Sequence, residues 1–121
     1  MRIEHWRPFL RWAFAVSLVV VMALALAPPR IPVPTTGWDK ANHALTFAML
    51  ALLGFASYPQ RKAGVLVALL AYGGMIELLQ GLTVYRTAEW LDWGADSVGL
   101  FLGSMLTRLS AVASQRLKGS S

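Results

Sequence analysis

Acidic, basic, histidine and glutamine residues recur at helical spacing near the ends of three apolar stretches. Such side chains can bind a charged ligand or carry a proton. Asp39 and His43 lie four residues apart, Glu77 and Gln80 three apart. Residues at such spacings share one face of a helix. Ionisable groups beside hydrocarbon are costly and usually mark a binding or proton-carrying site. The candidate site residues are Asp39, Lys40, His43, Glu77, Gln80, Arg86, Asp92 and Asp96.

The composition is that of a membrane protein rather than a soluble one. Hydrophobic residues make up 56% of the chain, mean hydropathy is +0.53 and 14% of residues are charged. The net charge of +5 could suggest a nucleic-acid partner, but the basic residues flank apolar stretches instead of clustering on a soluble face, so we expect none. The absence of cysteine excludes disulfides and thiolate metal sites.

Four apolar segments span about residues 9–27, 41–58, 63–82 and 90–113. Each is near the roughly 20 residues that cross a bilayer as a helix. Four such segments leave no polar faces for water, which excludes a soluble bundle. We therefore expect an all-α protein, a single domain over residues 1–121 that forms a membrane-embedded four-helix bundle.

The first segment also has the features of a signal peptide, because basic residues precede it and Ala25-Leu26-Ala27 ends it. Pro28 would then be the first residue after the cut, where we expect poor cleavage. The favoured interpretation is an uncleaved helix.

The distribution of lysine and arginine predicts the orientation. Eight basic residues lie at the two ends of the chain and in the turn at residues 61–62, against three in the other two loops. The positive-inside rule then places both termini in the cytoplasm and the carboxylate-rich loops outside.

Gly99 and Gly103 form a GxxxG motif that continues the stripe of Asp92 and Asp96 at four-three-four spacing. Small residues on such a stripe let helix backbones approach closely in a membrane. We expect this stripe to face another helix and to bring the carboxylates against it.

These motifs resemble those of VanZ-like membrane proteins over nearly the whole chain after the first segment. The resemblance rests on motifs that match in order and spacing: Asp39-Lys40-Ala41-Asn42-His43, Glu77-Leu78-Leu79-Gln80, Arg86, and Asp92-Trp93-Gly94-Ala95-Asp96 followed by Gly99 and Gly103. One departure is Asp96, where the family pattern more often has Asn, and it adds an ionisable group. The resemblance implies a small protein of the bacterial inner membrane that acts near envelope lipids, with a link to resistance to teicoplanin-type lipoglycopeptides.

The favoured function is an outward-facing polar pocket that binds an envelope lipid headgroup or a lipid-linked cell-wall precursor. Lys40 and Arg86 would meet phosphate or carboxylate groups. The alternatives are a proton-coupled exporter that uses Glu77, and a lipid-phosphate or ester hydrolase with His43 as base and Asp39 orienting it. A purely structural role is also open, in which Glu77 pairs with Arg86 or Lys40 to fix helix register.

We expect no cofactor, and no metal because no ligand-spacing motif is present. A homo-oligomer is compatible with the sequence. An enzyme is the least favoured class, because no nucleophile motif accompanies His43.

Reporter fusions test the topology. A fusion at Ser121 should report the cytoplasm, and one within residues 32–37 should report the outside, because eight basic residues lie on the first side and three on the second. Equal signals from the two fusions would contradict four membrane crossings.

Overall fold

The computed structural model describes residues 3–27, 39–83 and 89–119, and the side chains of residues 5–27, 40–83 and 89–119. A short 3-10 turn, Ile3–Trp6, leads into helix α1, Arg7–Leu26. Helices α2, Asp39–Ser57, α3, Lys62–Gly81, and α4, Trp90–Gly119, follow. The described residues are therefore all-α, and the expectation of four helices is confirmed.

The helix ends follow from the local sequence. Pro8 stands at the start of α1, where its missing N–H costs nothing. Helix α1 stops before Pro28 and α2 before Pro59, since the residue preceding a proline is disfavoured in helical conformation. The first three helices end within two residues of the expected bounds. Helix α4 continues to Gly119, six residues past the expected end.

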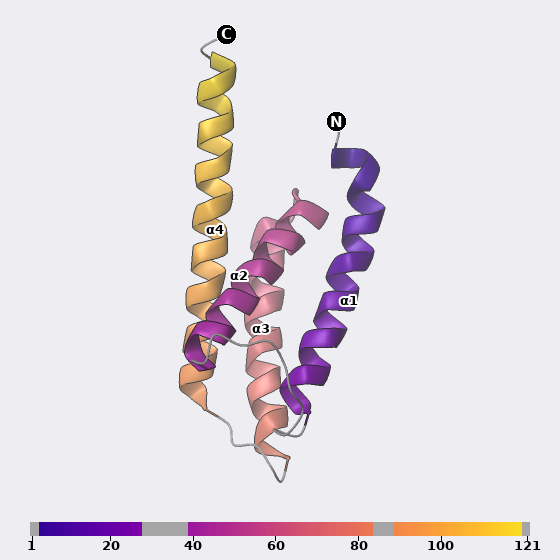
Figure 1. Ribbon diagram of the computed structural model, residues 1–121, viewed down its shortest axis with the longest axis vertical. Coiled ribbons are helices and arrows are strands. Elements are labelled where there is room, and N and C mark those ends of the chain that lie inside the picture. Colours follow the sequence, from indigo (N-terminus) through magenta and orange to yellow (C-terminus); the bar gives the residue numbers. More distant parts are fainter. Residues whose placement is uncertain (1–2, 28–38, 84–88, 120–121) are drawn as a thin grey trace.

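Helix α4 is 30 residues long, and beyond Met105 almost all of its side chains are exposed. In Figure 1 this part of α4 extends past the ends of α2 and α3. Both termini lie at the same end of the molecule, because the four helices alternate in direction. The starts of α2 and α4 and the end of α3 therefore meet at the opposite end.

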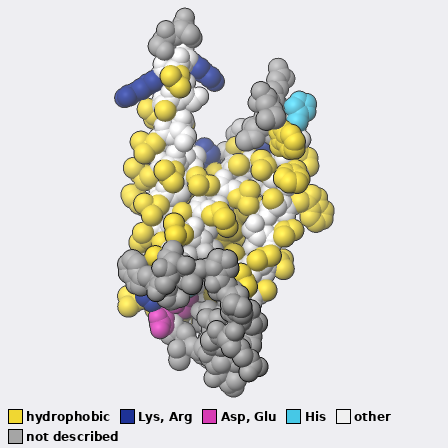
Figure 2. Space-filling view, in the orientation of Figure 1, with side chains coloured by type: hydrophobic (Ala, Val, Ile, Leu, Met, Phe, Trp, Pro, Cys, Tyr) yellow, Lys and Arg dark blue, Asp and Glu magenta, His cyan; other side chains and the backbone are white. Residues whose placement is uncertain are grey.

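Three helices, α1, α3 and α4, are long and apolar enough to cross a membrane. Helix α2 is not among them, because Lys40, Asn42 and His43 fall in its first turns and lower its mean hydropathy. Many large apolar side chains lie on the outside of the bundle, and Figure 2 shows them as a broad hydrophobic band. Three apolar helices with such an outer surface are typical of a multi-pass membrane protein.

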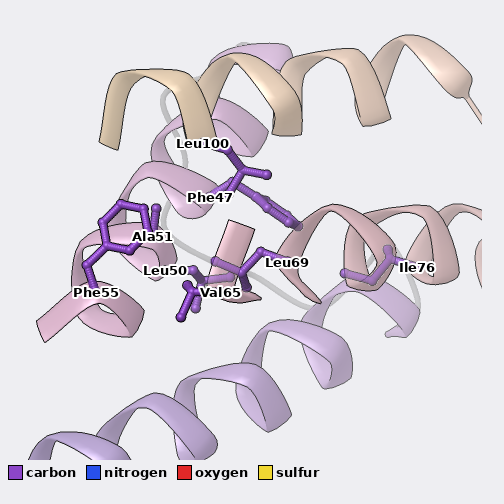
Figure 3. Close-up of a cluster of buried hydrophobic side chains, with 8 residues drawn as sticks. All are labelled: Phe47, Leu50, Ala51, Phe55, Val65, Leu69, Ile76 and Leu100. Atoms are coloured by element: carbon purple, nitrogen blue, oxygen red, sulfur yellow. The ribbon is translucent and has the colours of Figure 1, made fainter. Parts of the chain in front are cut away.

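Helix α2 lies at the centre and contacts the other three helices. It supplies half of the buried hydrophobic cluster, which Figure 3 shows. Helices α3 and α4 supply the rest, and α1 packs against the cluster from one side through half-buried residues such as Phe14 and Leu18. The full cluster is Phe47, Leu50, Ala51, Phe55, Val65, Leu69, Ile76 and Leu100.

The glycine stripe brings α2 and α4 into close contact. A Cβ atom on Gly99 would lie 2.2 Å from the carbonyl oxygen of Ala44, and one on Gly103 would lie 2.8 Å from Cβ of Ala51. Both distances are too short for non-bonded atoms, so only glycine fits at these two positions. The expectation that this stripe faces another helix is confirmed, and the partner is a row of alanines on α2.

Replacing Gly99 by alanine should push α4 away from α2 and lower the free energy of unfolding by about 1–3 kcal/mol, as overpacked contacts do. Gly94→Ala is the matched control on the same helix, because a Cβ there meets nothing within 4 Å. The control should keep or raise stability, by up to about 1 kcal/mol, through its better helix propensity. Unfolding in detergent micelles measures both, and equal stability of the two variants would contradict the close contact.

Candidate functional site

The polar side chains of three helices gather at the end of the bundle opposite the termini. We define the polar cluster as Lys40 and His43 of α2, Glu77 of α3, and Asp92 and Asp96 of α4. Figure 2 shows acidic and basic atoms together at this end, below the hydrophobic band. Both Glu77 and Asp96 are 0% exposed.

Lys40 links the first turns of α2 and α4. Its Nζ donates a hydrogen bond to Oδ1 of Asp92 and lies 2.7 Å from Oε2 of Glu89. Asp92 is buried, whereas the side chain of Glu89 is 55% exposed. The ammonium group of Lys40 therefore faces one buried and one exposed carboxylate.

His43 lies between two carboxylates of α4. Its Nδ1 is 2.8 Å from Oδ1 of Asp96, and its Nε2 is 3.5 Å from Oδ2 of Asp92. Residues 92 and 96 are one helical turn apart, so they contact the same ring from two sides. The extra ionisable group at position 96 thus has a direct role, since it fixes the orientation of the imidazole.

Glu77 is the deepest member of the polar cluster. Its Oε2 accepts a hydrogen bond of 2.9 Å from the backbone N–H of Glu89. Among the described residues, its buried Oε1 has no hydrogen-bond partner. Of the partners expected from sequence, Lys40 is engaged with Asp92 and Glu89, and Arg86 lies outside the described residues. An oxygen buried without a partner costs about 1–3 kcal/mol, and more when charged.

A glycine of α3 makes room for the carboxylate of Asp96. A Cβ atom on Gly73 would lie 2.8 Å from Oδ2 of Asp96 and 3.2 Å from the ring of Phe47. Any larger residue at position 73 would displace the carboxylate, the aromatic ring or both. Helix α3 therefore leaves space for the carboxylate of Asp96 by lacking a side chain at position 73.

The side chain of Gln80 reaches helix α1. Its Nε2 donates a hydrogen bond of 2.8 Å to the carbonyl oxygen of Ala25, near the end of α1. The hydroxyl of Tyr72 donates likewise to the carbonyl oxygen of Leu18. These two bonds from α3 to the backbone of α1 position the first helix, so the described contacts of Gln80 are structural.

The structure brings together five of the eight residues expected at one site, and adds one. The side chain of Asp39 and all of Arg86 lie outside the described residues. Glu89, which is not among the expected site residues, pairs with Lys40 and supplies a backbone donor to Glu77. Its spacing of three and seven residues from Asp92 and Asp96 puts it on their helical face and could have predicted this.

Comparison with known proteins gives no family for the chain. No protein-family model, no curated protein and no solved structure matches it.

Removing the charge of Lys40 tests how the polar cluster is held. Lys40→Met should destabilise the protein, because Asp92 would stay buried without its ammonium partner. The double variant Lys40→Met with Asp92→Asn should recover more than half of that loss, since no uncompensated charge remains. Thermal unfolding in detergent gives the comparison.

Lys62→Met is the control, because Lys62 is an exposed lysine at the other end of the bundle. It should unfold like the wild type. A double variant as unstable as Lys40→Met alone would contradict the ion pair.

Proposed function

We propose that this chain is a bacterial inner-membrane protein of the VanZ-like kind, with four membrane-crossing helices and both termini in the cytoplasm. The distribution of eight basic residues against three supports this orientation. Helix α2 can cross although its first turns are polar, because Lys40 and His43 pair with α4 instead of facing lipid. The end of the bundle that holds the polar cluster then faces the outside of the cell.

The polar cluster binds the headgroup of an envelope lipid or of a lipid-linked cell-wall precursor. The observation that carries this proposal is a groove of about 370 Å³ between α2 and α4. Its wall is apolar except for Lys40 at one end, and the other lining residues are Ala41, Ala44, Leu91, Ala95 and Val98. Such a groove suits an acyl or isoprenoid chain whose charged headgroup meets the lysine.

The charges around Lys40 favour a headgroup that carries both a positive and a negative charge. A phosphate would bond to the ammonium of Lys40, which lies beside the carboxylates of Asp92 and Glu89. These carboxylates repel a phosphate and attract an amine. A lipid or precursor that carries an amine near its phosphate therefore fits better than a simple anionic lipid.

The motif resemblance supports the same location. The namesake of the VanZ-like family is linked to resistance against teicoplanin, which acts on cell-wall precursors at the outer face of the membrane. A headgroup site at that face would give this chain access to the same molecules, and resistance would follow if binding altered their exposure to the drug.

A proton-coupled exporter is the second candidate, and one observation favours it. Glu77 is fully buried in a helix apolar enough to cross a membrane, and its Oε1 has no partner among the described residues. A carboxylate in such a position can take up and release a proton during transport. An exporter of soluble compounds would not retain a membrane lipid, so lipid analysis separates the two candidates.

A hydrolase with His43 as general base has the least support. Both ring nitrogens of His43 face carboxylates, Asp96 on one side and Asp92 on the other. The ring would have to leave one of these contacts to take a proton from water.

Lipids that copurify with the protein in mild detergent test the proposal. Mass spectrometry should find one headgroup class enriched above its share in the membrane. Ala95→Leu should reduce this enrichment several-fold, because the larger side chain fills the groove between α2 and α4. Glu77→Gln should also weaken retention if the polar cluster contacts the headgroup.

Val67→Phe is the matched control, since it fills a second apolar groove, between α3 and α4, whose lining includes no charged residue. This variant should retain the lipid as the wild type does. A lipid profile equal to that of the bulk membrane, or one unchanged by Ala95→Leu, would exclude the proposed site.

A further inference from the structure

We propose that His43, Glu77 and Asp96 form a binding site for a single divalent transition-metal ion. Each residue offers one ligand atom, and these three atoms all lie within 4.8 Å of one another. The residues come from three different helices, so no spacing motif in the sequence marks the set. This inference does not depend on lipid binding.

The geometry requires only small movements. Zinc binds histidine nitrogen and carboxylate oxygen at about 2.0–2.2 Å, so each ligand atom would have to move inward by less than about 1 Å. Rotation of the Glu77 and Asp96 carboxylates can supply most of this shift, because a terminal carboxylate torsion is broad. The helices themselves can stay in place.

The buried charge at this position calls for a cation. Glu77 and Asp96 are both 0% exposed, and their ligand oxygens lie within 4.8 Å of each other. His43, when protonated, can offset only one of the two negative charges. In addition, Oε1 of Glu77 is buried and has no hydrogen-bond partner among the described residues. A divalent ion would neutralise both carboxylates and would use that oxygen as a ligand.

The surrounding contacts match those of a metal-binding histidine. Such a histidine binds metal through one ring nitrogen and donates its other N–H to a carboxylate. Nδ1 of His43 faces Asp96, while Nε2 faces Asp92 at 3.5 Å. Asp92 is in turn held by Lys40, and Glu77 is oriented by the backbone N–H of Glu89. Two outer contacts thus orient two of the three ligands.

The ligand types narrow the choice of ion. One imidazole and two carboxylates suit zinc, manganese or iron better than magnesium or calcium, which prefer oxygen alone. Three protein ligands also leave at least one coordination position for a water molecule or for an oxygen atom of a bound compound. A phosphate oxygen could occupy it, which would offset the repulsion by the carboxylates.

Metal titration of the purified protein tests this site. After treatment with a chelator and removal of any affinity tag, the wild type should bind about one Zn²⁺ or Mn²⁺ per chain, measured by equilibrium dialysis and elemental analysis. Glu77→Gln and His43→Gln should each weaken binding at least tenfold. Asp92→Asn should keep the stoichiometry but lower affinity by about 10–100-fold, as loss of an outer contact does.

His5→Gln is the matched control, because the chain has two histidines and His5 is exposed in the short turn at the other end of the bundle. It should bind metal as the wild type does. Equal binding by His5→Gln and His43→Gln, or none by the folded wild type, would overturn the proposal.

A spectroscopic measurement on the wild type covers the case in which the Glu77 variant does not fold. Co²⁺ added to the metal-free protein should give visible absorption bands that saturate at about one ion per chain and disappear when Zn²⁺ is added. A signal that does not saturate would overturn the proposal, since it would mean scattered surface binding. This readout needs no lipid, so it can succeed or fail independently of headgroup binding.

Discussion

The close contact between α2 and α4 is the constraint on which the rest of the structure depends. Gly99 leaves its Cα against the carbonyl of Ala44, and no side chain separates the two helices there. Toward the starts of both helices, His43, the residue before Ala44, lies 2.8 Å from Asp96, which is one turn before Gly99. In a lipid bilayer the hydrophobic effect does not drive helices together, so the packing of small residues and polar contacts must hold them in place. The glycine contact and the polar cluster therefore stabilise the same pair of helices.

The polar cluster carries an energetic cost that its neighbours offset only in part. Lys40 compensates Asp92, and Asp92 together with Asp96 fixes the ring of His43. Glu77 receives one backbone hydrogen bond and keeps one buried oxygen without a partner among the described residues. A buried, incompletely satisfied carboxylate is destabilising, and proteins usually tolerate it where it serves binding, proton transfer or metal coordination. Headgroup binding, proton-coupled export and hydrolysis differ in what would complete the contacts of this carboxylate: a headgroup with or without a metal ion, a proton, or a substrate.

Much of the arrangement could be predicted from the sequence because membrane crossing leaves few options. The lengths of the apolar segments predict the helices, and prolines predict where two of them end. The packed face of α4 follows from the spacing of Asp92, Asp96, Gly99 and Gly103. Other features could not be read in this way. Gln80 bonds to the backbone of α1, and Glu89 pairs with Lys40, because these contacts depend on which helices are neighbours.

The sequence by itself determined the number of helices, their approximate ends and the polar residues that each one carries. These follow from local properties, namely hydropathy, spacing and backbone preference. Only the tertiary structure decided that α2 is central, that Gly73 makes room for Asp96, and that His43, Glu77 and Asp96 lie within 4.8 Å of one another. The physical reason is that helical periodicity fixes the face on which a residue lies, whereas the depth and rotation of each helix against its neighbours fix which residue it meets.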